Sequence, residues 1–214
     1  MLNNAQKEIR NFINNRHIDE LVHFTYVDNL ESILENGLLP VRDLYYNRIN
    51  HYYNDENRLE GRRDAVCLSI SFPNYKMFFK YRHYDNDNWC VIGLDPSILY
   101  EKDCLFCITN AASNYETRRN NYDKKNLRGL SKLFYDDGYR YEENIPLSYP
   151  TDPQAEVLVL DKIETPYINS IYFPSNNDKY NFFRENYEPS YYNENYRFKI
   201  DKRFFAPRKD YKNW

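Results

Sequence analysis

One stretch of the sequence, Asp152-Pro-Gln-Ala-Glu-Val-Leu-Val-Leu160, constrains the fold more than any other. Val157 to Leu160 form an apolar, partly β-branched run, which predicts a buried strand. Glu156 stands at the entrance of this strand, and Gln154 is expected on the same face because side chains alternate along a strand. A carboxylate in this place is costly unless it is paired or takes part in chemistry. A solvated strand end is the simpler interpretation, so the rest of the chain must decide.

The length of 214 residues predicts a single domain over residues 1–214. No apolar run approaches the roughly 20 residues of a membrane span. The N-terminus, from Met1 to Glu8, lacks the apolar segment of a signal peptide. We therefore expect a cytoplasmic protein with no membrane partner.

The cysteines and histidines do not predict a metal site. Cys104 and Cys107 have a C-x-x-C spacing, but Leu105 and Phe106 lie between them and no second pair follows. The cysteines lie in or near apolar runs, which favours buried thiols. The four histidines are scattered along the chain. No metal is expected.

Helical and strand patterns mix along the chain, which predicts an α+β fold with a mostly antiparallel core and helical decorations. Leu21 to Thr25 favour a strand, and Asp28 is predicted to cap the next helix, with Glu31 as its capping-box partner and Gly37 as its end. Further strands are expected at residues 65–71, 89–94, 105–109 and 168–173, and helices at residues 4–15, after Asn74 and at residues 176–187.

Polar residues of the first strand suggest a ligand site. His23 and Thr25 share one face directly before a helix N-terminus, where phosphate or ribose groups bind readily. A histidine whose ring is hydrogen-bonded for structural reasons is an equally good interpretation.

The polar connection over residues 41–64 is too long for a plain loop in a compact domain, so we expect a functional loop or lid.

Basic and aromatic residues interleave between residues 110 and 152. Arg118 and Arg119 lead a series that continues with Lys124, Lys125, Arg128 and Lys132 and alternates with Tyr115, Tyr122 and Tyr135. Single-stranded nucleic acid needs such charges for its phosphates and such rings for its bases. A solvated, partly helical surface has the same composition. The net charge of -3 means that any nucleic-acid binding depends on local patches.

The sequence has no glycine-rich phosphate loop, which argues against Rossmann and P-loop nucleotide sites. The ordered set of motifs resembles the ADP-ribosyltransferase fold, and specifically the DarT family of nucleic-acid-base ADP-ribosyltransferase toxins. The resemblance rests on His23-Phe-Thr25 with Val27-Asp-Asn-Leu30, on Asn54-Asp55 with Arg58-Leu-Glu-Gly61, on the block from Cys67 to Met77, and on Gln154-Ala-Glu156. It covers residues 20 to 173.

The resemblance implies roles for individual residues. Glu156 and Arg58 would be catalytic, with Arg62 and Arg63 as alternatives for the arginine. His23, Thr25, Asn29, Arg58 and Phe79 would bind NAD, and Phe78 or Tyr81 could take the place of Phe79 on the nicotinamide ring. The segment from Tyr135 to Tyr149 would lie beside the target base. The expected substrate-binding residues are Gln154, Tyr149, Arg118 and Arg119.

The resemblance also implies an activity. The chain would transfer ADP-ribose from NAD to a base of single-stranded DNA, with guanine favoured over thymine because of the block from Asn54 to Gly61. A carboxylate stabilises the positive charge that develops on the ribose, and a base must leave its stack to be reached. A toxin of this kind, in a toxin–antitoxin or phage-defence system, implies a cognate antitoxin. A base of single-stranded RNA, a protein side chain as the acceptor, and a catalytically dead nucleic-acid-binding module are the alternatives.

Overall fold

A computed structural model describes residues 1–52, 61–84, 88–185 and 197–210 of the protein. Its centre is a seven-stranded sheet in the order β4-β5-β2-β1-β3-β6-β7. All pairings are antiparallel except that of β6 with β7. The strands are β1 (Leu21–Tyr26), β2 (Val66–Ile70), β3 (Trp89–Leu94), β4 (Cys104–Cys107), β5 (Glu156–Val159), β6 (Ile168–Phe173) and β7 (Arg197–Ile200). The predicted α+β fold with a mostly antiparallel core is confirmed.

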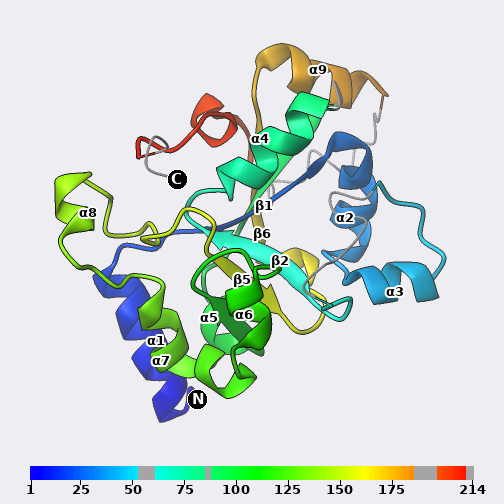
Figure 1. The fold of residues 1–214 in the computed structure, drawn as a ribbon. Coiled ribbons are helices and arrows are strands. Elements are labelled where there is room, and N and C mark those ends of the chain that lie inside the picture. The colour runs from blue at the N-terminus through cyan, green and yellow to red at the C-terminus, as the bar shows by residue number, and fades with distance from the viewer. Residues whose placement is uncertain (53–60, 85–87, 186–196, 211–214) are drawn as a thin grey trace.

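Helices surround the sheet on several sides. In Figure 1, α1 and α7 lie side by side at the lower end, α4 lies above β1 and β2, and α2 and α3 lie together at the right. The helices are α1 (Asn4–Asn15), α2 (Leu30–Asn36), α3 (Val41–Tyr46), α4 (Tyr75–Tyr84), α5 (Ile98–Glu101), α6 (Asn114–Arg118), α7 (Asn126–Lys132), α8 (Tyr139–Glu142) and α9 (Asn176–Glu185). Short 3-10 turns are η1 (Val27–Asn29), η2 (Asn121–Lys124), η3 (Thr165–Tyr167) and η5 (Lys202–Phe205).

The alternation of side chains along β5 explains how this strand can carry a carboxylate. Val157 and Val159 point into the main hydrophobic core, which also contains Ile9 and Ile13 of α1. Leu158 points to the other face, into a small cluster beside β4. Because Glu156 and Leu158 are two residues apart, they share this second face. The apolar run therefore fixes the strand, and the alternation keeps Glu156 out of the main core.

The central strands β1 and β2 pair for only two residues. Their register joins Leu21 to Ile70 and Val22 to Ser69 and stops there. β1 continues alongside β3 as far as Tyr26, whereas β2 is paired with β5. The two strands thus separate beyond Val22, and the sheet opens between them.

The segment after β1 differs from its prediction. The chain passes from β1 directly into η1, so Asp28 lies inside this turn, and neither η1 nor α2 has a side-chain cap. The predicted capping box of Asp28 and Glu31 is therefore wrong. The predicted end of α2 at Gly37 is confirmed: its φ is 80°, and a Cβ atom there would lie 2.2 Å from the carbonyl oxygen of Ile163.

Candidate active site

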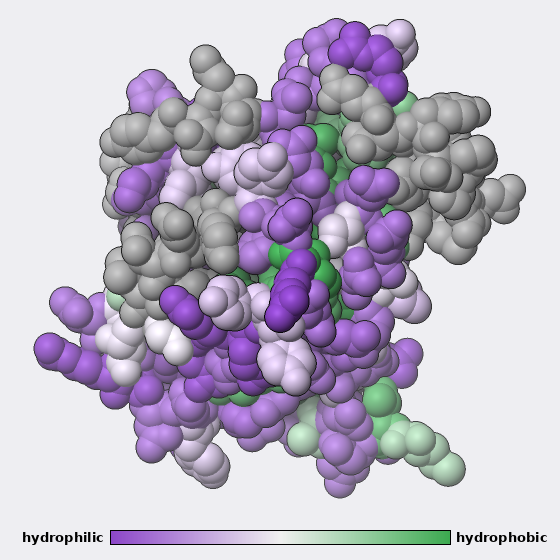
Figure 2. Space-filling model, turned by 90° about the vertical axis from the view of Figure 1, so that its right-hand side faces the viewer, coloured by the Kyte–Doolittle hydropathy of each residue, from purple (hydrophilic) through white to green (hydrophobic). Residues whose placement is uncertain are grey.

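A cleft opens where β1 and β2 separate. Residues of β1, of α2 and of β2 line it. The face that carries α2 and α3 is shown in Figure 2, where a hydrophobic patch lies between hydrophilic side chains. The residues that line the cleft include His23, Thr25, Asn29, Tyr52, Met77 and Glu156. The structure thus brings together four of the residues predicted to form the site.

The β1 side of the cleft is held by side-chain hydrogen bonds. His23 Nδ1 lies 2.9 Å from the carbonyl oxygen of Cys67, at the point where β2 has left β1. A carbonyl only accepts hydrogen bonds, so this nitrogen carries a proton. The Asn29 amide donates to Thr25 Oγ1 at 3.0 Å and to the Tyr52 carbonyl at 2.9 Å, and it accepts from the Tyr52 N–H at 2.8 Å. Asn29 therefore fixes the segment at Tyr52 against the end of β1.

Glu156 lies at the opposite side of the cleft and is 6% exposed. Its Oε2 accepts from the backbone N–H of Ala111 at 2.7 Å, and its Oε1 accepts from the Asn74 amide at 3.3 Å. A buried carboxylate is tolerated when its oxygens are hydrogen-bonded in this way. The interpretation of Glu156 as a solvated strand end does not fit this burial.

The charge in the cleft is concentrated on Glu156. Among the described residues that line the cleft, it is the only Asp, Glu, Lys or Arg. Cys107 is paired with Glu156 in the sheet register, and burial raises the pKa of its thiol, which therefore stays neutral. A single carboxylate in a largely apolar cleft is suited to stabilise a positive charge that develops on a ligand.

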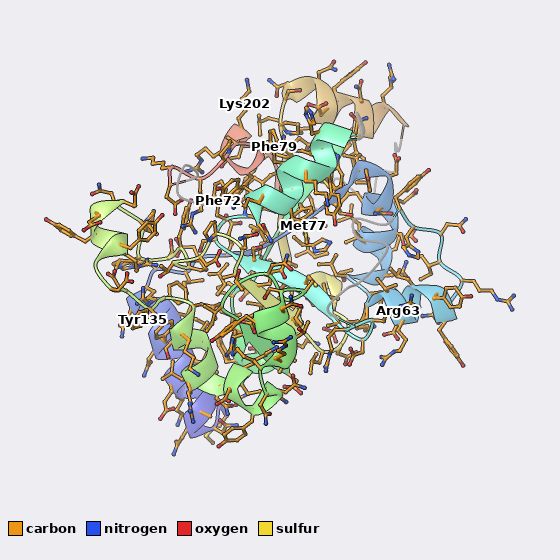
Figure 3. The ribbon with its side chains drawn as sticks, viewed as in Figure 1. Arg63, Phe72, Met77, Phe79, Tyr135 and Lys202 are labelled. Atoms are coloured by element: carbon orange, nitrogen blue, oxygen red, sulfur yellow. The ribbon has the colours of Figure 1, made fainter. Side chains whose placement is uncertain are left out.

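Helix α4 presents Met77 rather than Phe79 to the cleft. Phe78 is fully buried, stacked on Phe24 with ring centroids 4.6 Å apart. Phe79 is 54% exposed, lies parallel to His83 at 5.7 Å, and does not line the cleft. Figure 3 shows Met77 below α4, towards β2, and Phe79 on the upper side of the helix. The helical period therefore turns Phe79 away from the predicted nicotinamide position.

The segment before β5 is held by two buried arginines, and we call residues 146–152 the arginine-held loop. Arg140 donates to the carbonyl oxygens of Pro146 and Tyr149, both at 2.8 Å, and to Thr151 Oγ1 at 3.0 Å. Arg208 donates to the carbonyl oxygens of Pro150, at 2.7 Å, and Thr151, at 3.0 Å. These bonds satisfy carbonyls that have no strand partner in the loop.

Two predicted substrate contacts lie at this loop. The Tyr149 ring packs 5.5 Å from the Phe72 ring and below the Arg208 guanidinium at 5.9 Å. Gln154 lies in a turn, with its N–H on Asp152 Oδ1 at 2.7 Å, because β5 begins only at Glu156. The expectation that Gln154 and Glu156 lie on the same face of one strand is therefore wrong. Neither Tyr149 nor Gln154 lines the cleft.

The arginines predicted to act in the site have different surroundings. Arg118 is exposed at the end of α6, whereas Arg119 donates to Glu116 Oε1 at 2.6 Å and to the Asp123 carbonyl at 3.0 Å. Arg62 pairs with Asp64 at 3.1 Å, and Arg63 is exposed near α3 (Figure 3). Arg58, with Asn54 and Asp55 of the same motif, lies outside the described residues.

Two contacts of Glu156 were not predicted from the sequence. Asn74 was expected only as a helix cap, and its Oδ1 does accept from the Met77 N–H at 3.3 Å, as a cap of α4 would. The same side chain also donates to Glu156. Ala111 contributes a backbone N–H. Every residue except proline has one, so the residue type at this position does not indicate the contact. The position of Asn74 between a predicted strand and an aromatic helix was the only signal that the sequence offered.

Comparison with known proteins places this fold among the ADP-ribosyltransferases. Residues 22–190 match the family described as ssDNA thymidine ADP-ribosyltransferase, DarT. The match covers well over half of the chain, and the chain belongs to the DarT family. This confirms the resemblance and the predicted enzyme class, an NAD-dependent ADP-ribosyltransferase. A comparison with curated proteins returned no match.

Solved structures of the same family share the fold. Thermosipho africanus DarTG in complex with ADP-ribose has a TM-score of 0.63 at 20% identity, over 87% of this chain and 51% of that chain. Thermus sp. 2.9 DarT in complex with NAD+ has a TM-score of 0.57 at 13% identity, over 88% and 98%. The same protein in complex with ADP-ribosylated ssDNA has a TM-score of 0.58 at 15% identity, over 89% and 97%. The present chain spans about half the length of the DarTG chain.

No helix in the part of the chain that the structure describes is both long and apolar enough to span a bilayer.

Proposed function

We propose that the protein transfers ADP-ribose from NAD to a base of single-stranded DNA, with Glu156 as the catalytic carboxylate. The bond between nicotinamide and ribose C1′ breaks, nicotinamide leaves with the electron pair, and a base nitrogen forms the new bond to C1′. The proton of that nitrogen passes to Glu156. One observation carries this proposal: Glu156 is buried, accepts a hydrogen bond from Ala111, and lines the same cleft as residues of β1.

The hydrogen bonds of Glu156 fit this chemistry. The N–H of Ala111 and the amide of Asn74 each donate to the carboxylate and fix its orientation. A fixed negative charge beside the ribose stabilises the positive charge that develops there as nicotinamide leaves. In this proposal NAD is bound by His23, Thr25 and Asn29, and its pyrophosphate is bound by Arg58.

Exposed residues on α6, which follows the segment that contributes Asn110 and Ala112 to the cleft, support a single-stranded nucleic acid as the acceptor. Arg118 and Tyr115 are both exposed on α6, where a phosphate and a base can be contacted together. Tyr149 and Gln154 lie on or directly after the arginine-held loop, two to seven residues before the catalytic glutamate. We assign base recognition to this loop. The solved Thermus relative in complex with ADP-ribosylated ssDNA supports DNA as the substrate class.

The base that accepts ADP-ribose is a finer part of the proposal. The block from Asn54 to Gly61 leads us to favour guanine, while the description of the family names thymidine. Oligonucleotides that contain a single guanine or a single thymine among unreactive bases separate the two outcomes. Mass spectrometry of each oligonucleotide after incubation with NAD locates the added ADP-ribose.

The same assay decides between acceptor classes. We expect matched DNA to be modified and RNA of the same sequence and a mixture of cellular proteins to remain unmodified. Modification of RNA alone, or of protein alone, would overturn the DNA assignment and favour one of those transferases. Glu156→Ala should abolish toxicity in cells, whereas a binding module without catalysis would stay equally toxic.

A cognate antitoxin completes the proposal. An enzyme that modifies DNA bases harms its own cell unless it is restrained, so a partner must block the cleft or remove the modification. Co-expression with the product of an adjacent gene tests this idea: restored growth identifies the partner, and growth that stays inhibited with every neighbouring gene product argues against a toxin–antitoxin pair.

A further inference from the structure

A second carboxylate, Glu116, lies buried close to the catalytic one. Its side chain is 0% exposed. Oε1 accepts from the backbone N–H of Ile108 at 2.7 Å and from Arg119 Nη1 at 2.6 Å. Lys124 donates to the carbonyl oxygen of Glu116 at 2.6 Å, and its Nζ lies 3.4 Å from Oε2. One acidic and two basic side chains therefore form a buried cluster at α6, in a part of the chain whose composition is typical of a basic surface.

The cluster is built into the fold by close packing. Gly129 of α7 lies so close to the Lys124 backbone that a Cβ atom there would approach the Lys124 carbonyl carbon to 2.5 Å. Arg119 reaches the Asp123 carbonyl at 3.0 Å, which ties α6 to η2. Burying three charges in this way is costly unless each has its partners. These contacts tie the cluster to the backbone of Ile108, Asp123 and Glu116 itself.

What Glu116 holds is the segment that contacts Glu156. Ile108 follows directly after β4, and residues 108–113, which we call the acid-held loop, run from it to the start of α6. Ala111 in this loop donates its N–H to Glu156 Oε2 at 2.7 Å, and Asn110 lines the cleft. Glu116 is thus linked to the catalytic carboxylate through four residues of backbone, from Ile108 to Ala111, with a hydrogen bond at each end.

We infer that Glu116, with Arg119 and Lys124, is a positioning residue for the transferase reaction, which sets the Ala111 N–H against Glu156. The inference rests on the proposed function of Glu156. It gives Arg119 a different role from the DNA contact predicted from the sequence. Loss of the cluster should lower kcat, because the carboxylate loses its orientation, and leave KM for the DNA unchanged.

The experiment compares Glu116→Gln and Arg119→Met with the wild-type protein. Glu116→Gln keeps an oxygen for the Ile108 N–H but removes the charge, and we expect kcat to fall by tenfold to about a hundredfold. Arg119→Met should lower kcat in the same direction and by less. In both variants the Ala111 amide should exchange with solvent faster, whereas the amides of β1 should keep their exchange rates.

Phe182→Leu is the matched control for a general loss of stability. Phe182 of α9 is buried against Phe173 of β6 and does not line the cleft. A fall in kcat equal to that of this control at matched melting temperature would overturn the inference. A change in KM for DNA alone in Arg119→Met would also overturn it and restore the DNA contact. If Glu116→Gln fails to fold, the Arg119 variant decides.

The two proposals fail in different ways. A folded wild-type protein that transfers no ADP-ribose would contradict the proposed function, and the exchange rate of the Ala111 amide would still test its link to Glu116. An active wild type whose variants keep kcat and the Ala111 exchange rate would contradict only the link.

Discussion

Two segments flank Glu156, and the protein fixes them with buried charges of opposite sign. The acid-held loop presents backbone N–H groups, and the carboxylate of Glu116 accepts one of them while Glu156 accepts another. The arginine-held loop presents backbone carbonyls, and Arg140 and Arg208 donate to four of them. In each case the charge matches the backbone group that lacks a partner in regular structure.

The two loops differ in how far along the chain their anchoring side chains lie. Glu116 is only eight residues from Ile108, so the acid-held loop is stabilised by its own neighbourhood in the chain. Arg208 lies 58 residues from Pro150 and beyond the region that matches the family, residues 22–190. The anchor of the acid-held loop is therefore local, although Ala111 and Glu156 themselves lie 45 residues apart. The loop assigned to base recognition depends both on nearby Arg140 and on the C-terminal segment.

The largest effect is expected from Glu156→Gln, which removes the charge between the two loops. Activity should fall by about 10²- to 10⁴-fold, because the developing ribose charge and the base proton lose their partner. The glutamine keeps an oxygen for the Ala111 N–H, so the free energy of unfolding should change by less than about 1 kcal/mol. Initial rates and urea unfolding measure the two quantities. A loss of stability as large as that of activity would mean that the loops depend on this charge.

Arg208→Met should produce the largest loss of stability. The Arg208–Asp210 pair is 3% exposed on both sides, so the change leaves a carboxylate buried without its arginine and should cost about 3–5 kcal/mol. Adding Asp210→Asn should restore part of this loss. Arg203→Met is the matched control: Arg203 also pairs with an aspartate two residues away but is 81% exposed, and it should cost less than about 1 kcal/mol.

Arg140→Met should cost less than Arg208→Met, about 1.5–3 kcal/mol. The three groups to which Arg140 donates are neutral oxygens, so no buried charge is left behind. We also expect KM for the DNA to rise while KM for NAD stays the same, since only the arginine-held loop is loosened. Equal increases in both constants would show that the two sides of the cleft are not held independently.

The smallest effect is expected at Asp152, where the two loops meet. Burial raises the pKa of this carboxyl, against the opposing effects of hydrogen bonds from Thr109 and the Gln154 N–H. The folded protein therefore holds this proton more tightly than the unfolded chain does, and stability falls as the pH rises above the ordinary carboxyl pKa. Asp152→Asn, which does not titrate, should lose less stability over that range. Urea unfolding of both proteins at several pH values checks the slope, and parallel curves would exclude a role for this carboxyl.

Local pattern was enough to predict several helices and strands outside the site. The strand at β6 and the helix at α1 lie where periodicity places them, because each buries one apolar face. The arginine side chains show the limit of such reasoning. Arg118 and Arg119 are neighbours of the same type, but one is exposed and the other is bound to Glu116. Residue type and spacing do not distinguish them, because the difference depends on contacts with η2.

The sequence by itself determined the strand that carries Glu156, the His-x-Thr strand opposite, and the family to which both belong, since alternation and motif order are properties of the chain. Only the tertiary structure decided that β1 and β2 separate after Val22, that Ala111 and Asn74 bind the carboxylate, and that Met77 faces the cleft in place of Phe79. These depend on strand register, on backbone groups and on the rotation of a helix about its axis. None of them is written in the identity of a single residue, because each arises from groups that meet only when the chain has folded.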